Sequence, residues 1–396
     1  MSDQWEATTL GTLFSEPKER IIPADVSERY VGLEHLATDQ PSIRVWGDSS
    51  DWTSLSNRFR SGDTLFGRLR PYLRKVALAP FAGVCSGEIL VWRPRSDRVT
   101  PEFLHLISSS SRVLSHAVDV SAGSRMPRVS SKDLAAIPVE VPPLPVQLRL
   151  VAVMDSIDTQ IEALQVEVEA TERLLSGLRR DRFERLRHQK VRAGEKFDML
   201  LGRQKSKRQE FGDHVAPYLR AANIGAGDLS LTDVKTMNFE PDERAKYALA
   251  PDDVVLVEGG SIGQASLWSG EIDGFVGFDK HVIRIRAREG VSLPHYALHW
   301  CHWSRETGAF AEQATGITIK ALGFKRATDM QVSDLSLAEQ ANLVAPLVSM
   351  DREYVRLNEE LERLRAFRSA TLNALLSREV EIPESFDETI GFEGVA

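Results

Sequence analysis

Residues 148–180 read LRLVAVMDSIDTQIEALQVEVEATERLLSGLRR, and their pattern indicates the architecture of the whole chain. The apolar residues of this stretch recur at alternating steps of four and three positions, from Leu150 through Met154 to Leu178. Such heptad spacing places the apolar side chains on one seam of a helix that packs against a partner helix. The sequence therefore predicts a helix about 50 Å long, because each residue adds ~1.5 Å.

A second copy of this pattern lies 193 residues further along the chain. The same offset relates Val139 to Val332 and Gln147 to Gln340, and residues 62–65 resemble residues 252–255 at an offset of 190. The second seam weakens at Arg368 and Thr371; before that it consists of Leu343, Leu347, Met350, Tyr354, Leu357, Leu361 and Leu364. The chain is therefore predicted to contain two divergent copies of one plan, each a globule followed by a helix.

The two globular parts are predicted to mix strands with helices. Residues 64–66, 88–92, 254–257 and 281–285 have the composition of buried strands, and residues 101–107 and 294–300 that of helices opening at proline. The predicted domains are a first globule at 1–147, a helix at 148–190, a second globule at 191–340, a helix at 341–378 and an acidic tail at 379–396.

Composition describes an ordinary globular protein of two or three domains, with 396 residues of which 42% are hydrophobic. The net charge of −8 argues against a nucleic-acid partner at first sight, but the tail alone has six acidic residues and no lysine or arginine, which leaves −2 for residues 1–378. Cys85 and Cys301 resemble neither a disulfide framework nor a metal site. With no basic, apolar leader at the N-terminus and no long apolar run, we expect a cytoplasmic protein that contacts no membrane.

Several catalytic signatures are missing from the sequence. Glycine is never followed by lysine, so there is no phosphate-binding P-loop, and the run Gly259–Gly263 suits a tight turn between strands better than a dinucleotide site. No Asn/Asp-Pro-Pro-aromatic tetrapeptide of an amino-methyltransferase occurs, and no histidine has a partner at ligand spacing. We therefore predict no catalytic residue and no metal site: the protein binds rather than reacts.

Basic residues gather in a few places and are the candidate phosphate contacts. Basic residues follow the strand at residues 64–66. A second basic loop, which opens with glycine, lies near residue 125 and has a counterpart near residue 320. These segments suit close approach to a DNA backbone. Arginine and asparagine in the second globule are types that read guanine and adenine. The alternative for each is a solvated surface. The candidate DNA-binding residues are Arg68, Arg70, Arg74, Lys75, Arg125, Arg128, Arg203, Lys205, Lys207, Arg220, Asn223, Lys320 and Lys325.

Two stretches, GDTLFGRLRPYLRKV at 62–76 and IPVEVPPLPVQ at 137–147, together with the duplication, make the chain resemble the specificity subunit of Type I restriction-modification systems. The second hinge, Ser336–Gln340, keeps only its leucine and the Glu-Gln pair. The resemblance implies an α+β fold: two mixed α/β target recognition domains joined by two long helices that form an antiparallel coiled coil, with a pseudo-two-fold internal repeat. The seam would consist of Leu150, Met154, Ile157, Ile161, Leu164, Leu347, Met350, Tyr354, Leu357 and Leu361.

The resemblance also implies a function. Each globule would read one half of a bipartite, asymmetric site in double-stranded DNA, and helices about 50 Å long would separate the half-site centres by roughly 15 base pairs. Catalysis would belong to partners: two modification subunits with S-adenosylmethionine, and motor-nuclease restriction subunits with ATP and Mg²⁺. This chain itself would hold no cofactor. The alternatives are a coiled-coil scaffold without DNA specificity and, less favoured by the missing motifs, an enzyme that modifies DNA alone.

Overall fold

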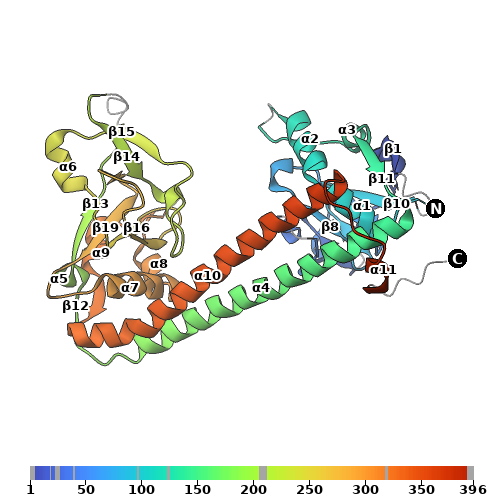
Figure 1. Cartoon of the computed structure of the whole chain (residues 1–396). Helices are drawn as coiled ribbons and strands as arrows, with labels where there is room; N and C mark the ends of the chain where they lie inside the picture. The colour runs from blue at the N-terminus through green and yellow to red at the C-terminus, as the bar shows by residue number, and fades with distance from the viewer. Residues whose placement is uncertain are drawn as a thin grey trace. The chain divides into compact units, whose positions relative to one another are not determined.

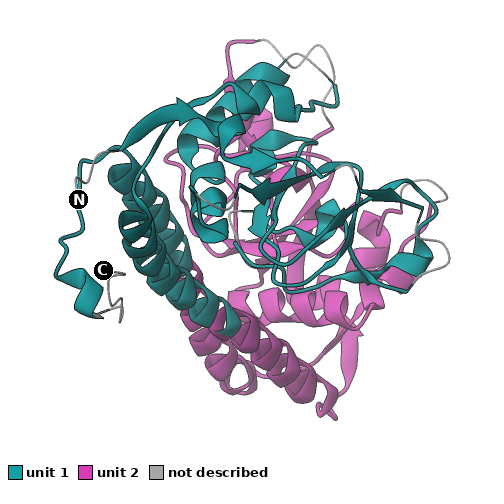
Figure 2. Ribbon diagram, turned by 90° about the vertical axis from the view of Figure 1, so that its right-hand side faces the viewer, with its two compact units in different colours: residues 1–166, 359–396 teal, residues 167–358 magenta. Residues whose placement is uncertain are grey.

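The computed structural model describes residues 5–17, 19–22, 27–38, 41–95, 98–122, 125–204, 212–316 and 320–389. The chain divides into two compact units (Figure 2): the first unit comprises residues 1–166 and 359–396, and the second unit comprises residues 167–358. Both long helices contribute one part to each unit. Consequently each unit contains a globule and a segment of two paired helices.

The first unit contains three sheets (Figure 1). Their strand orders are β2-β10-β7-β8, β3-β6-β9-β4-β5 and β1-β11. The first and third sheets are antiparallel throughout, whereas β4 pairs with β9 in parallel. The strands are β1 (Glu6–Thr9), β2 (Phe14–Ser15), β3 (Arg20–Ile21), β4 (Arg29–Val31), β5 (Gly47–Asp48), β6 (Ser56–Phe59), β7 (Thr64–Gly67), β8 (Val76–Leu78), β9 (Gly83–Cys85), β10 (Ile89–Pro94) and β11 (Pro138–Val141).

Short helices cover these strands. Helix α1 begins where sequence predicts, because Pro101 suits the first helical turn and the Thr100 side chain accepts a hydrogen bond from Phe103 N at 3.1 Å. The core packs apolar residues of the strands against one another, among them Phe59, Leu65 and Val91. The helices are η1 (Leu10–Thr12), η2 (Leu33–His35), η3 (Ser49–Asp51), η4 (Pro71–Leu73), α1 (Pro101–Ser108), α2 (Ser111–Ser121) and α3 (Ser131–Ala135).

The second unit repeats this architecture. Its four-stranded antiparallel sheet β13-β19-β16-β17 corresponds to β2-β10-β7-β8, and β12-β20 corresponds to β1-β11. A third sheet, β15-β14-β18, keeps the parallel pair. The strands are β12 (Lys190–Arg192), β13 (Phe197–Leu201), β14 (Val215–Leu219), β15 (Lys235–Asn238), β16 (Asp253–Val257), β17 (Ala265–Trp268), β18 (Gly277–Phe278), β19 (Val282–Ala287) and β20 (Gln331–Ser333).

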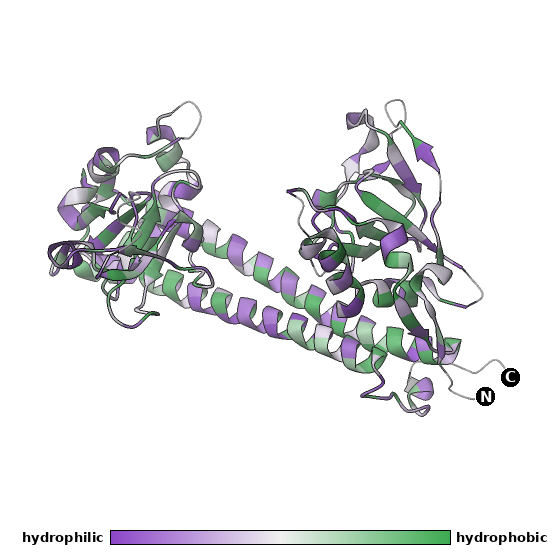
Figure 3. Ribbon diagram, turned by 90° about the horizontal axis from the view of Figure 1, so that it is seen from above, coloured by the Kyte–Doolittle hydropathy of each residue, from purple (hydrophilic) through white to green (hydrophobic). Residues whose placement is uncertain are grey.

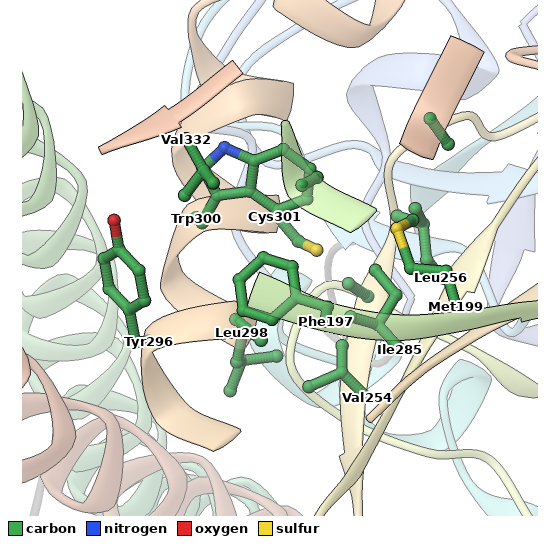
Figure 4. Packing of buried hydrophobic residues seen from close by; sticks show 14 of the residues in the cluster. Phe197, Met199, Val254, Leu256, Ile285, Tyr296, Leu298, Trp300, Cys301 and Val332 are labelled. Carbon is green, nitrogen blue, oxygen red and sulfur yellow. The ribbon is translucent and has the colours of Figure 1, made fainter. Parts of the chain in front are cut away.

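The core of the second unit lies between its four-stranded sheet and α7. Figure 4 shows Trp300 and Cys301 of α7 beside Phe197 of β13, with the Phe197 and Trp300 ring centroids 5.6 Å apart. Tyr296 donates a hydrogen bond to Ser333 O at 2.8 Å, so its buried hydroxyl is satisfied. The helices are α5 (Ala193–Lys196), η6 (Ala221–Asn223), α6 (Pro241–Tyr247), α7 (Pro294–Glu306), α8 (Ala309–Gln313) and α9 (Phe324–Asp329).

Two buried glutamines demonstrate the repeat atom by atom. Gln147 Nε2 donates to Arg98 O and Pro142 O, both at 2.9 Å, and its Oε1 accepts from Thr100 N at 3.0 Å. Gln340 Nε2 donates to Val291 O at 3.0 Å and Leu335 O at 2.9 Å, and its Oε1 accepts from Leu293 N at 2.9 Å. Every partner in the second set lies 193 residues after its counterpart. The glutamine thus satisfies the same three backbone groups in both copies.

A buried aspartate closes a turn in both copies as well. The carboxylate of Asp63 forms a bidentate ion pair with the guanidinium of Arg93, and both nitrogen–oxygen distances are 2.9 Å. Asp253 binds Arg286 in the same way, with both distances 2.7 Å. The offsets are 190 for the aspartates and 193 for the arginines, which agrees with the drift seen in the sequence. Planar guanidinium and carboxylate groups match each other in this geometry, which ties the two central strands together.

Helices α4 (Leu144–Glu184) and α10 (Leu337–Leu376) run antiparallel within each unit. In the first unit Arg368 binds Asp158 at a nitrogen–oxygen distance of 2.8 Å, and Arg365 donates to Gln165 at 3.2 Å. Lower residue numbers on α10 are thus paired with higher residue numbers on α4, so the two helices run in opposite directions. In the second unit Arg179 lies 3.8 Å from Asp351, and Arg182 donates to Asn342 O at 3.3 Å, which gives the same direction.

The predicted seam is largely buried. On α4 the side chains of Leu150, Met154, Ile157 and Ile161 are buried and Leu164 is half-buried. On α10 the buried members are Leu347, Leu357 and Leu361, and Met350 and Tyr354 are half-buried. Arg368, where the sequence weakens, is 9% exposed and its ion pair with Asp158 fills that place in the seam. The predicted α+β class and coiled coil are confirmed.

Several details differ from the prediction. The first long helix begins at Leu144 rather than 148, because Pro145 is tolerated in the first turn of a helix. Residues Glu88 and His281 lie just before their strands rather than within them. The tail is not simply solvated: Arg149, 5% exposed, forms an ion pair with Asp387 of α11 (Phe386–Thr389) at 2.6 Å. The domain boundaries at 147, 190, 340 and 378 stay predictions.

Across the described residues, none of the helices combines the length and apolar character needed to cross a membrane.

Candidate nucleic-acid interface

Two predicted basic segments of the first unit lie side by side. The segment after β7 and the segment before α3 meet through a bridge between Leu69 and Arg128. Arg70 N donates to Pro127 O at 2.8 Å, and Val129 N donates to Arg68 O at 3.1 Å. We call these two segments, residues 68–74 and 125–129, the paired loops of the first unit. The structure thereby brings together Arg68, Arg70, Arg74, Arg125 and Arg128, which the sequence lists in two separate windows.

Arg128 is held by a carboxylate. Its Nε donates to Glu88 Oε2 at 2.9 Å and its Nη2 donates to Glu88 Oε1 at 2.9 Å. These hydrogen bonds lower the pKa of Glu88, because they stabilise the charged carboxylate. The Arg68 Nε atom is buried and has no hydrogen-bond partner among the described residues. Arg70 and Arg125 are exposed, and neither side chain has a hydrogen bond or ion pair within the described part of the chain.

Lys75 and Arg74 turn toward the body of the first unit. Lys75 Nζ donates to Leu33 O at 2.5 Å, so this lysine anchors η2. Arg74 is half-buried and lines a groove of about 580 Å³ together with His105, Glu362 and Arg365. These two residues are therefore placed to brace the loop rather than to meet a phosphate directly.

The second unit has paired loops at the equivalent place. Gly259 bridges Ala321, Leu322 N donates to Glu258 O at 2.8 Å, and Gly260 N donates to Lys320 O at 3.4 Å. These contacts match those of Leu69, Val129 and Arg70 one by one at offsets of 190 and 193. We call residues 258–263 and 320–323 the paired loops of the second unit. Residues 317–319, between α8 and Lys320, lie outside the described residues.

The basic residues in and next to these second paired loops come from residues 320–326 only, since residues 258–263 contain none. Lys320 and Lys325 are exposed, as a phosphate contact requires. Arg326 instead donates to Leu322 O and to Thr315 Oγ1, both at 2.7 Å, and so fastens the loop. Where the first unit has Arg68 and Arg70, the second has Glu258 and Gly260. The two surfaces therefore share a backbone plan and differ in charge.

Three other residues of the second unit that were predicted to contact DNA bind groups within the unit instead. Arg203 is 6% exposed and forms a bidentate pair with Glu243, with its Nε 2.8 Å from Oε1. Asn223 is 2% exposed, and its Nδ2 donates to Ser230 O at 2.8 Å and to Asp233 O at 3.2 Å. Arg220 lies 2.5 Å from Asp233. Burial and these contacts favour a structural role for Arg203 and Asn223 over contact with a base. Lys205 and Lys207 lie outside the described residues.

Three titratable groups with shifted pKa values belong to helices α1, α7 and α10. In the first unit burial lowers the pKa of His105 to about 3, and the charge of Arg368 acts in the same direction. In the second unit burial raises the pKa of Asp351 to about 6, against the opposing influence of Arg179. Burial also lowers the pKa of His302 to about 4. No nucleophile and base lie together among these groups, so they indicate packing rather than catalysis.

The described residues contain no group of three or more histidine, cysteine, aspartate or glutamate side chains placed to hold a metal ion. Cys85 and Cys301 are buried in different units and form no disulfide, and burial raises the pKa of both thiols. Buried thiols of this kind are unreactive.

Comparisons with known proteins agree with this architecture. Residues 60–171 match the family model described as Type I restriction modification DNA specificity domain. The specificity subunit of Type I restriction enzyme EcoDI from Escherichia coli is 28% identical over 148 residues, which cover 35% of this chain and 32% of that protein. The match thus spans about a third of the length of that curated relative.

Two solved structures share the fold over most of the chain. A chain from a study of complex assembly in the type I R-M system aligns with a TM-score of 0.55 and 19% identity, covering 94% of this chain and 97% of that one. The type I restriction-modification S subunit from M. genitalium aligns with a TM-score of 0.52 and 15% identity, covering 94% and 96%. At these identities the likeness concerns the fold alone.

Residues 60–171 are thus similar to the Type I restriction modification DNA specificity domain, and most of the chain shares the fold of the two solved structures. The resemblance to specificity subunits of Type I restriction-modification systems is thereby confirmed. The sequence indicated basic loops in both copies, but it did not predict that the two loops within each unit pair with each other. The repeat was the available signal, since an offset of 190 relates Leu69 to Gly259 and an offset of 193 relates Arg128 to Ala321.

Proposed function

We propose that this chain is the non-catalytic subunit that reads a bipartite DNA target for a Type I restriction-modification complex. The observation that carries the proposal is the pairing of equivalent loops in both units, with Arg70 and Arg125 exposed in one and Lys320 and Lys325 beside the other. Exposed cations on stiff loops suit phosphate contacts, which hold a protein on DNA in a fixed register. The matched DNA specificity domain supports the same function.

The two half-sites should differ in sequence. The paired loops of the first unit contain three arginines in residues 68–74, whereas residues 258–263 of the second unit contain none. Base recognition depends on side-chain type at each position, because each base pair presents its own donor and acceptor pattern. The target is therefore asymmetric, with one half read by residues 1–147 and the other by residues 191–340.

The long helices would set the spacer and receive the partners. Helices of 41 and 40 residues are each about 60 Å long at ~1.5 Å per residue. The side chains of Leu174 and Phe367 are 65% and 57% exposed, which are high exposed fractions for apolar residues on a helix. The two residues are 193 positions apart in the sequence. Equivalent apolar residues on the two repeats suit two copies of one partner, the modification subunit.

In this proposal the chemistry belongs to partner subunits. The modification subunits would carry S-adenosylmethionine and methylate adenine, and motor-nuclease subunits would use ATP and Mg²⁺. This chain would work in the cytoplasm without a cofactor of its own. The competing function is that of a scaffold protein without DNA specificity. The exposed cations on both pairs of loops favour DNA binding over a scaffold function.

The proposal is tested by expressing the chain with a modification subunit and mapping methylated adenines in host DNA. We expect a split, asymmetric motif that disappears when this chain is omitted. Replacing residues 1–147 with those of a relative should change one half of the motif and leave the other. A continuous motif, or a replacement that alters both halves, would contradict the two-reader arrangement.

The docking surface has its own test. Leu174→Glu and Phe367→Glu place a charge in the apolar contact, so each should weaken co-purification with the modification subunit. Gln160→Glu introduces the same charge at an exposed polar position of α4 and is the matched control. Equal recovery of all three complexes would exclude these two residues from the contact.

A further inference from the structure

The turn at residues 70–74 of the first unit has an unusual backbone. Arg70 and Arg74 adopt φ angles of 54° and 51°, in the left-handed region where a Cβ atom collides with the following carbonyl. Glycine avoids this collision because it has no Cβ. Two such arginines four positions apart therefore cost stability that the first unit must recover from other contacts.

The second unit shows that this cost is avoidable. Arg70 N and Gly260 N donate to equivalent carbonyls, of Pro127 and Lys320, so the two residues correspond. Gly67 N donates to Lys75 O and Val257 N to Gln264 O, which places Gly263 opposite Arg74. Gly260 and Gly263 have φ angles of 80° and 85°. The turn of the second unit is one residue shorter and has glycine at both left-handed positions, where the first unit has arginine. Strain kept in this way indicates a role for the arginine-flanked side chains.

Between the two arginines the turn presents Tyr72. Its side chain is 54% exposed, whereas Tyr30, which serves the core of the same unit, is 3% exposed. The turn itself is stiff: Pro71 is buried, Leu73 N donates to Arg70 O at 2.9 Å, and Arg74 N donates to Pro71 O at 2.9 Å. The second unit has Gly-Ser-Ile-Gly at this place and no aromatic residue. A rigid, exposed tyrosine two positions from Arg70 is suited to contact the edge of a base in a groove of duplex DNA.

We propose that Tyr72 is a specificity-determining residue of the first unit, whose side chain contacts the edge of a base in the first half-site while Arg70 contacts an adjoining phosphate. Arg74 is a positioning residue, since its side chain lines the groove with Glu362 and Arg365 and braces the turn. The proposal rests on the proposed function, in which the first unit reads DNA. It adds that the second unit, which has no aromatic residue here, reads its half-site by other contacts.

The decisive experiment measures Kd by fluorescence anisotropy for the complex of this chain with its modification subunits. The duplexes are the mapped target and variants changed in one half-site at a time. Tyr72→Ala should weaken binding to the target about tenfold and reduce discrimination at the first half-site, with discrimination at the second half-site retained. Ile22→Ala, which removes an apolar side chain that is 61% exposed in the same unit, is the control.

Arg70→Gly separates the functional side chain from the fold. It should raise the melting temperature, since the left-handed backbone is then relaxed, and yet weaken DNA binding and reduce the slope of log Kd against log salt by about one. Unchanged affinity and discrimination for Tyr72→Ala would overturn the inference, as would a lower melting temperature for Arg70→Gly. Failure of the unmodified complex to discriminate at the first half-site would instead contradict the proposed function.

Discussion

The two units share a backbone plan and differ in how each treats its polar groups. Gln147 and Gln340 bind the same three backbone groups, and Asp63 and Asp253 bind equivalent arginines. At the paired loops, by contrast, arginine in the first unit stands where the second has glutamate or glycine. At these loops the outward-facing side chains differ between the units, while the buried hydrogen bonds that hold the plan together are kept. Losing a contact of this kind leaves a buried backbone group without a hydrogen-bond partner, which lowers the free energy of unfolding.

The largest expected effect comes from breaking a shared contact. Gln147→Leu and Gln340→Leu each remove partners from three backbone groups, at a cost of roughly 5 kcal/mol, since an unsatisfied buried group costs about 1–3 kcal/mol. Thermal melts of the two variants should show similar losses. A large loss in one variant and none in the other would break the equivalence of the two units.

The next effect should distinguish the units. Asp158→Ala leaves Arg368 as a buried charge without its bidentate partner and should cost about 3–5 kcal/mol. Asp351→Ala should cost less, because Arg179 keeps Glu306 and because the pKa of Asp351, raised to about 6 by burial, shows that its charged form is poorly stabilised. Urea unfolding at pH 7 checks the order. Equal losses would refute the asymmetry.

The third effect is the contribution of His105, in the first unit, to the pH dependence of stability. Burial lowers the pKa of His105 to about 3, so below pH 6.5 the unfolded chain takes up a proton that the folded chain does not. Stability should fall by about 2 kcal/mol from this residue between pH 7 and pH 5, as 1.36 kcal/mol per pKa unit implies.

His105→Leu reproduces Leu298, the residue 193 positions later in the second unit. Melting temperatures at pH 7 and pH 5 should therefore differ less for this variant than for the unmodified chain. His116→Gln, at a part-exposed position of the same unit, is the control. An identical pH dependence in all three proteins would rule out His105 as its source.

The smallest expected effect compares the strained turn in its two forms. Arg70→Gly should stabilise the protein by about 1 kcal/mol and Gly260→Ala should destabilise it by a similar amount, since both change the cost of a left-handed backbone. An added Cβ at Gly260 meets no atom within 4 Å, so only the backbone conformation is at issue. Melting temperatures that move in the same direction for both variants would contradict this explanation.

Some parts of the site could be predicted because they follow local rules. Heptad spacing identified the seam from Leu150 to Leu361, since a helix repeats its faces at a fixed period whatever surrounds it. Proline at residues 101 and 294 marked two helix starts for a similarly local reason. Arg203 and Asn223 show the limit. Residue type suggested DNA contacts, but Glu243 and the 230–233 segment bind these side chains from elsewhere in the chain.

The duplication, the two heptad helices and the basic segments could be predicted from residue order, because periodicity and offset are properties of that order. Folding brings together two basic segments of the first unit about 55 residues apart, and it gives Arg70 and Arg74 a left-handed backbone that residue order did not reveal. A backbone angle at a single residue is set by the hydrogen bonds that surrounding segments impose on it, such as Arg70 N to Pro127 O. Those partners come together only when the chain has folded.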